Sequence, residues 1–362
     1  MSEYFTDREC MELYEQACEL PDGRAKIELL EQAVRIADRL GDIKGAYTIR
    51  TELVETAVFN GYALKAITHF SWQLGQFDRD PSAYWERNLL WSYKWIVSNS
   101  LHFPQISRQQ LMELMQDMRD RFVRAGYTER TYYGNLFTFY IHTGEFELAD
   151  EYYEKVQQME REDISDCSAC ERNEIVDYLV ASGRDEESLE AADDILKGKL
   201  SCAEVPHLTM AVVLLPLYRL GRNKEAVRYQ RKNYSMICDN RDFLRSIGEH
   251  IAYLTYADPF HGLELYEQYA EWSLDCDSLL DRMYFHAYAA GLFRVLAQED
   301  VQFQLRLPES YPYVEDRTDV QSLSRHLQEM ALELAEQFDQ RNGTPYYSGV
   351  VSQLSNPQPI HG

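Results

Sequence analysis

Residues 133–156 read YGNLFTFYIHTGEFELADEYYEKV and carry the clearest structural signal in the chain. Large apolar side chains recur at steps of three and four residues on both sides of Gly144, which is the spacing of one face of an α-helix. A glycine in this position is typical of a helix end followed by a tight turn. The stretch therefore predicts a hairpin of two helices whose apolar stripes the hairpin alone cannot cover.

Glycine and proline residues that end helices recur along the whole chain. The main breaks lie about 40 residues apart, and a second set of breaks falls between them, so each unit holds two helices. The main breaks are at Gly23, Gly61, Pro104, Gly144, Gly183, Gly221 and Pro259. Hairpins repeated at a nearly fixed period can bury their apolar stripes by stacking on one another, which is the construction of a solenoid.

The composition agrees with a helical, globular and acidic protein. With 36 Lys+Arg against 60 Asp+Glu, the formal net charge is −24, which argues against nucleic acid and anionic membranes as partners. The 17 glycines and 11 prolines are few for 362 residues, which favours helices over turn-rich β structure. The hydrophobic share of 45% is that of a folded chain.

The chain is expected to lie in the cytoplasm. Its first residues lack the basic and apolar blocks of a secretory leader. The longest apolar run, residues 208–218, is too short for a membrane span and contains Pro216. Seven cysteines without a secretion signal indicate reduced thiols rather than a disulfide framework.

The hairpin around Gly144 resembles a tetratricopeptide repeat (TPR). The resemblance is carried by Tyr133, Leu136, Phe137, Tyr140, Gly144, Phe146, Ala149, Tyr153 and Val156, with partial copies around Gly61, Gly183 and Gly221. It implies an all-α fold, a right-handed α-solenoid of about seven to eight helix-turn-helix hairpins. The period is longer than the 34 residues of the family, so an irregular array is expected. A closed helical bundle is the alternative.

Three segments are predicted. Residues 1–300 form the helical repeat array, residues 301–341 an insertion loop and a C-terminal capping helix, and residues 342–362 an irregular tail. The insertion contains Pro308 and Pro312, and the tail shows no helical periodicity. No linker in the chain calls for a second domain.

Four side chains suggest a metal site. Cys167 and Cys170 form a C-x-x-C pair, and Cys202 and His207 follow one repeat later, at the start of the next hairpin. Neighbouring helix starts in a solenoid lie close together, so these residues could hold a structural zinc ion. One C-x-x-C pair is a weak signal, and ordinary buried thiols are the main alternative. A redox role is less favoured because no βαβ pattern surrounds the pair.

The sequence contains no recognisable catalytic set. None of the nine histidines has metalloprotease spacing, and the chain lacks a nucleophile elbow, a Walker loop and a dinucleotide-binding glycine pattern. Adjacent acids are expected by chance among 60 Asp and Glu residues. The chain is therefore predicted not to be an enzyme. Trp85, Trp91 and Trp95 crowd one helix, and burial within the stack is the favoured interpretation.

The TPR resemblance implies that the first helix of each hairpin lines a concave face on which a partner lies. The candidates on that face are Asn135, Thr138, His142, Asn173, Asp177, Tyr218 and Arg219. The Lys/Arg/Asn clamp of chaperone-binding TPR proteins is absent. The hypothesis is a non-catalytic scaffold for a protein or peptide, a basic partner fitting the net charge. The alternative is a regulatory receptor that binds a small signalling peptide in the groove or a structural zinc in its Cys/His cluster.

Overall fold

The computed structural model describes residues 5–299, 303–308, 311–312 and 316–359. Within these residues the regular secondary structure is entirely helical, which confirms the predicted all-α fold. The helices are α1 (Arg8–Glu19), α2 (Arg24–Leu40), α3 (Ile43–Val58), α4 (Ala63–Arg79), α5 (Glu86–Ser100), α6 (Arg108–Arg124), α7 (Arg130–Thr143), α8 (Phe146–Gln157), α9 (Ser168–Ala181), α10 (Asp185–Leu196), α11 (His207–Val212), α12 (Leu214–Arg219), α13 (Asn223–Ile237), α14 (Leu244–Ala257), α15 (Pro259–Tyr269), α16 (Leu279–Leu296), α17 (Val320–Asn342) and α18 (Tyr346–Leu354).

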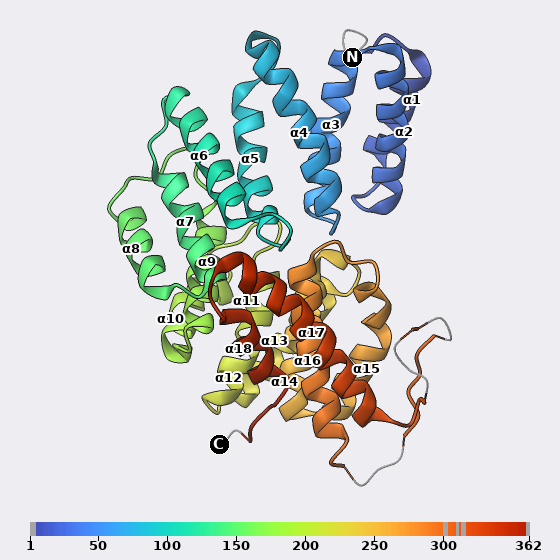
Figure 1. The fold of residues 1–362 in the computed structure, drawn as a ribbon, viewed down its shortest axis with the longest axis vertical. Coiled ribbons are helices and arrows are strands. Elements are labelled where there is room, and N and C mark those ends of the chain that lie inside the picture. The colour runs from blue at the N-terminus through green and yellow to red at the C-terminus, as the bar shows by residue number, and fades with distance from the viewer. Residues whose placement is uncertain (1–4, 300–302, 309–310, 313–315, 360–362) are drawn as a thin grey trace.

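Consecutive helices pack against one another as antiparallel pairs, and the pairs follow one another in a curved array (Figure 1). Every predicted main break lies at a junction between two helices. One further break separates α11 from α12 at Val213. Pro216 explains it, because proline has no N–H to donate to the carbonyl of residue 212 and its ring crowds that turn. The architecture is the all-α solenoid that the sequence predicted.

The interior of the array is divided into successive apolar cores. The large N-terminal core takes its residues from Cys10 to Ile164, and the large C-terminal core runs from Val176 to Leu327. A small cluster around Phe137 and Ala149 lies between them, on the hairpin that first revealed the repeat. Ala149 is fully buried, as expected of a small residue that lets α8 approach α7 closely. The middle hairpins therefore connect two well-packed halves.

The C-terminal region differs from the expected irregular tail. Helix α18 occupies residues 346–354, and its Tyr347 and Val351 are buried against α16 and α17. Asp339 of α17 accepts hydrogen bonds from the backbone N–H groups of Tyr347 (2.8 Å) and Ser348 (3.0 Å), so another helix caps the N-terminus of α18. The expectation was wrong here because this helix is held by tertiary contacts. Residues 360–362 of the predicted tail lie outside the described residues.

The segment between α17 and α18 ties the end of the chain to its middle. Arg341 donates to the carbonyl of Leu101 (2.7 Å), and Asn342 donates to the carbonyl of His142 (3.2 Å). Thr344 donates to the carbonyl of Thr143 (2.6 Å). These bonds join α17 to the α5–α6 and α7–α8 turns across more than half of the sequence. They anchor the C-terminal end of the array to its middle hairpins.

The predicted insertion precedes α17. Its described part, residues 303–308, 311–312 and 316–319, contains no helix, while residues 301–302, 309–310 and 313–315 lie outside the described residues. Leu305, Leu307 and Tyr311 of this insertion are buried in the C-terminal core. The insertion is thus anchored to the array by apolar side chains.

The tryptophan-rich helix α5 is buried only in part. Leu89, Leu90 and Tyr93 are buried. Trp91 and Trp95 are partly buried, with Lys94 Nζ 3.6 Å from the centre of the Trp91 ring. Trp85, just before the helix, is 81% exposed, which is contrary to the expected burial.

Gly144 is expected to be a sensitive position in the array. Its φ is +70°, and a Cβ atom there would lie 2.5 Å from the ring of Tyr346 at the start of α18. Gly183 has nearly the same φ, +75°, but nothing lies within 4 Å of a Cβ added there. Gly183→Ala should therefore lower the free energy of unfolding by about 1 kcal/mol through backbone strain alone. Gly144→Ala should lower it by about 1–3 kcal/mol more because Tyr346 must move.

Denaturant unfolding of the two glycine variants measures this difference directly. Equal losses of stability for both would show that Tyr346 does not press against the α7–α8 turn.

Candidate functional site

The residues predicted on the first helix of the central hairpin are largely engaged within the chain. Asn135 is 9% exposed, and its side-chain amide donates to the carbonyl of Thr131 (2.9 Å). Thr138 donates to Glu174 on α9 (3.1 Å). His142 shares a hydrogen bond of 2.9 Å with the hydroxyl of Tyr347 on α18. This face of α7 therefore already contacts α9 and the C-terminal helix.

Helix α9 presents the next two predicted residues. Asn173 is buried; its side chain donates to Asp177 (2.9 Å) and accepts from Thr209 of α11 (2.5 Å). Asn173 thus fixes the position of the Asp177 carboxylate and joins two neighbouring hairpins. Asp177 itself stays partly exposed.

Two further carboxyl groups lie near enough to Asp177 to be affected by its charge, Glu174 on α9 and Glu249 on α14; we call Glu174, Asp177 and Glu249 the interior carboxyls. Burial and, to a smaller extent, the nearby Asp177 carboxylate together raise the pKa of Glu174 to about 7. Burial also raises the pKa of Asp177 to about 6, and that of Glu249, on α14, to about 8. All three side chains are only partly exposed to solvent. The site therefore combines deep enclosure with an excess of acidic groups.

One cation, Arg245 of α14, lies among the interior carboxyls. Its Nε atom is 3.4 Å from a carboxylate oxygen of Glu249, and its guanidinium carbon is 4.4 Å from the centre of the Tyr284 ring. Although burial opposes its charge, Tyr284 and Glu249 raise the pKa of Arg245 well above its ordinary value. The Arg245 guanidinium influences all three carboxyls and opposes the rise of their pKa values.

The remaining predicted residues lie on α12. Tyr218 donates to the carbonyl of Tyr256 (3.2 Å), and Arg219 lies 3.5 Å from Asp185. Arg219 also lines a pocket of about 230 Å³ that α12, α14 and α16 form with the C-terminal segment. That segment contributes Gln353, Asn356, Gln358 and Pro359, which no pattern in the sequence indicated. These residues could not be recognised from sequence because their place beside α12 depends on how α18 docks.

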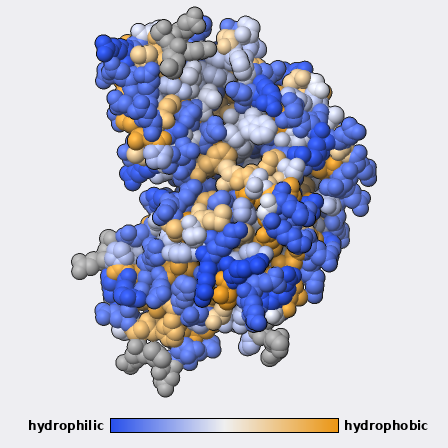
Figure 2. Space-filling view, turned by 180° about the vertical axis from the view of Figure 1, so that it is seen from behind, coloured by the Kyte–Doolittle hydropathy of each residue, from blue (hydrophilic) through white to orange (hydrophobic). Residues whose placement is uncertain are grey.

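The space-filling view shows a notch between the N-terminal hairpins and the C-terminal half of the molecule (Figure 2). Hydrophobic side chains are visible along this notch, while most of the surrounding surface is hydrophilic (Figure 2). The surface of the array is therefore indented on this side.

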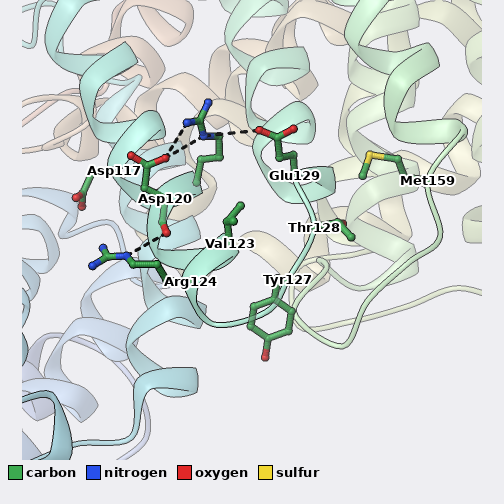
Figure 3. Close-up of a pocket in the computed structure, with 9 residues that line it drawn as sticks. Asp117, Asp120, Val123, Arg124, Tyr127, Thr128, Glu129 and Met159 are labelled. Atoms are coloured by element: carbon green, nitrogen blue, oxygen red, sulfur yellow. Dashed lines mark hydrogen bonds and ion pairs between the residues drawn. The ribbon is translucent and has the colours of Figure 1, made fainter.

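A larger recess than the one beside Arg219 lies at the end of α6 (Figure 3). It measures about 850 Å³ and is formed by α6, the α6–α7 turn and Met159. Its charges pair with one another: Arg119 contacts Asp120 (2.8 Å) and lies 3.7 Å from Glu129, and Arg124 donates to the carbonyl of Asp120 (3.2 Å). A recess whose charges are already paired offers little to attract a charged ligand.

Three of the four predicted metal ligands come together. The sulfur atoms of Cys167, Cys170 and Cys202 all lie within 4.8 Å of one another, and we call these residues the cysteine cluster. Cys170 is 3.3 Å from Cys167 and 3.4 Å from Cys202. Burial and the two neighbouring thiols raise the pKa of Cys170. The local sequence produces this arrangement because Cys167 caps α9 and Cys170 lies in its first turn.

His207 does not join the cysteine cluster, which corrects the predicted four-ligand set. Its ring stacks on Phe243 with the centres 5.5 Å apart and an angle of 11°, and its Nδ1 atom is buried. Sequence spacing placed His207 near the cluster, but the packing of α11 against Phe243 turns the ring toward the core.

Comparison with known proteins does not assign the chain to a family: no protein-family model matches it, and no curated protein matches it. Of the described helices, none combines the length and apolar character needed to cross a bilayer.

The interior carboxyls should make the stability fall as the pH rises. Asp and Glu ionise near pH 4 in an unfolded chain, whereas Glu249 holds its proton to about pH 8 in the folded protein. Between these pH values the folded state thus binds more protons than the unfolded state. The free energy of unfolding therefore decreases as the pH rises to about 8. Glu249→Gln should flatten this dependence and stabilise the protein at pH 8 by about 1–3 kcal/mol.

Unfolding measured between pH 5 and pH 8 tests this expectation, with Glu190→Gln on the exposed side of α10 as a control that keeps the wild-type slope. An unchanged slope in Glu249→Gln would contradict the enclosure of this carboxyl.

Proposed function

We propose that this chain is a non-catalytic interaction scaffold that binds a protein or peptide on the interior face of a TPR-like helical array. The observation that carries the proposal is the set of interior carboxyls, which is enclosed by protein yet retains solvent contact. Groups held in this way can be reached by a side chain that enters from outside. They also interact with it more strongly than surface charges do, because less water screens them.

The chemistry of the site favours a basic partner. Three carboxyls lie near the guanidinium of Arg245, and an incoming Lys or Arg side chain would pair with carboxyls that lose their protons as the cation binds. The formal net charge of −24 attracts the same partner over longer distances and speeds its encounter. A short signalling peptide with a basic side chain would use the same carboxyls, so the receptor hypothesis differs only in the length of the ligand.

Capture from extracts of the native host tests the scaffold proposal. Immobilised wild-type protein should enrich a basic protein or peptide, and the double variant Glu174→Gln, Asp177→Asn should reduce that enrichment by more than about tenfold. The binding should weaken as salt is added. It should strengthen from pH 6 to pH 8, because a bound cation favours the ionised carboxyls.

A charge-matched control is available on α10, where Glu186 and Glu190 are exposed. The variant Glu186→Gln, Glu190→Gln removes the same number of acidic groups and should capture as much partner as wild type. Equal losses in both double variants would mean that only net charge matters, and the interior site would then be rejected.

We also propose that the cysteine cluster binds a structural zinc ion. Three thiols from the start of α9 and from the α10–α11 connection lie at a separation that one metal ion can bridge. The cluster is surrounded by a small apolar group, Ala169, Ile195 and Val205, that is separate from the two large cores. A metal bound here would strengthen the junction between α9 and the α10–α11 connection. Only a small group of apolar side chains packs at this junction.

Metal analysis and thermal unfolding test the zinc proposal. Protein purified without chelators should carry one equivalent of zinc, and free zinc at a hundred times Kd should stabilise the apoprotein by about 2.7 kcal/mol. Cys202→Ser should abolish this gain, whereas Cys238→Ser, a free cysteine outside the cluster, should retain it. Zinc-independent unfolding of the wild type would leave ordinary thiols as the explanation.

A further inference from the structure

The three sulfur atoms of the cysteine cluster are close to the arrangement that one zinc ion requires. Zn–S bonds of about 2.3 Å in tetrahedral geometry place two sulfur ligands about 3.8 Å apart. The distances from Cys170 to its two neighbours are 3.3 and 3.4 Å, so a metal would need only small side-chain movements.

The backbone around the cluster supports thiolate ligands. The N–H of Cys170 donates to the sulfur of Cys167 (3.3 Å), a bond that favours the charged form of that sulfur. Cys167 is also the N-cap of α9, a helix of 14 residues whose N-terminal end carries a partial positive charge. Ala169, Ile195 and Val205 are each at most 3% exposed and exclude water from the inner side of the cluster.

The fourth coordination position has no side-chain donor among the residues that the structure describes. No fourth His, Cys, Asp or Glu joins the group within the described residues. His207, the ligand expected from sequence, stacks on Phe243 instead. All three cysteines are partly exposed, so the outer side of the cluster is accessible to solvent.

We propose that the cysteine cluster binds Zn²⁺ through three thiolates and leaves a fourth, exchangeable position that accepts an imidazole from outside the chain. The inference rests on the zinc proposal and goes beyond it, because a purely structural zinc site is closed by four protein ligands. On binding, three S–H groups lose their protons to solvent, three Zn–S bonds form, and water fills the fourth position.

Charge favours imidazole as the incoming ligand. Zn²⁺ with three thiolates carries a net charge of −1, in a chain whose formal net charge is already −24. A neutral imidazole displaces the neutral water without adding charge, whereas a fourth thiolate would make the site doubly negative. Zinc also accepts nitrogen donors readily beside sulfur. A histidine presented by a binding partner has this chemistry.

Cobalt substitution tests the coordination directly, because sulfur-to-cobalt charge-transfer bands report the thiolates and ligand-field bands report the number and kind of ligands. Co²⁺ added to the full-length protein should produce both sets of bands. His207→Phe, which retains an aromatic ring against Phe243, should leave them unchanged. Free imidazole should then shift the ligand-field bands of wild type and His207→Phe alike, without loss of the charge-transfer bands.

Three outcomes separate the claims. If His207→Phe changes the bands before imidazole is added, His207 is a ligand and the open position is disproved, while the metal site stands. If imidazole leaves the ligand-field bands unchanged, the site is closed and the inference fails. If neither Co²⁺ nor Zn²⁺ binds, the zinc proposal itself fails. Cys202→Ser should weaken Co²⁺ binding more than about tenfold, and Cys238→Ser should not.

Discussion

An amphipathic helix pair has no interior of its own, and this constraint governs the architecture of the chain. Each hairpin covers part of its apolar surface internally and must bury the rest against the hairpins before and after it. The array therefore builds its cores progressively, from the N-terminal core to the C-terminal one. The ends of such an array leave uncovered surface, and here the last helices fold back to cover it. Arg341 and Thr344 bond to turns near the middle of the chain, and Tyr347 and Val351 fill the space between α16 and α17.

The docking of the last helices covers part of the surface that the first helices of the hairpins would otherwise present. A fully open array would present the first helices of its hairpins as one continuous groove. In this molecule α18 contacts His142, and the C-terminal segment forms one wall of the pocket beside Arg219. The interior carboxyls of α9 and α14 remain partly exposed. Their raised pKa values and their interaction with Arg245 have the same origin, which is the removal of charged groups from bulk water.

The two proposed sites share α9. Cys170, Asn173, Glu174 and Asp177 lie at steps of three and four residues along that helix. The start of α9 carries Cys167 and Cys170 of the cysteine cluster, and the following turns carry Glu174, Asp177 and the Asn173 amide that bonds Asp177. Thr209 of α11 bonds to Asn173, so the connection that contains Cys202 leads directly to a helix that contacts the carboxyl face. A binding site and a metal site on one helix are held at a fixed separation by its backbone.

The sequence by itself determined the helices, their pairing and their junctions, because glycine, proline and the three-to-four-residue apolar spacing act on the local backbone. It also brought Cys167 and Cys170 together, since a C-x-x-C pair at a helix start is a local structure. Only the tertiary structure decided that His207 turns to Phe243, that residues 346–354 form a helix, and that Glu174 and Glu249 join Asp177. Each of these depends on contacts between distant segments. The packing of those segments sets the orientation of the His207 ring, the capping of α18 by Asp339 and the burial of the Glu249 carboxyl.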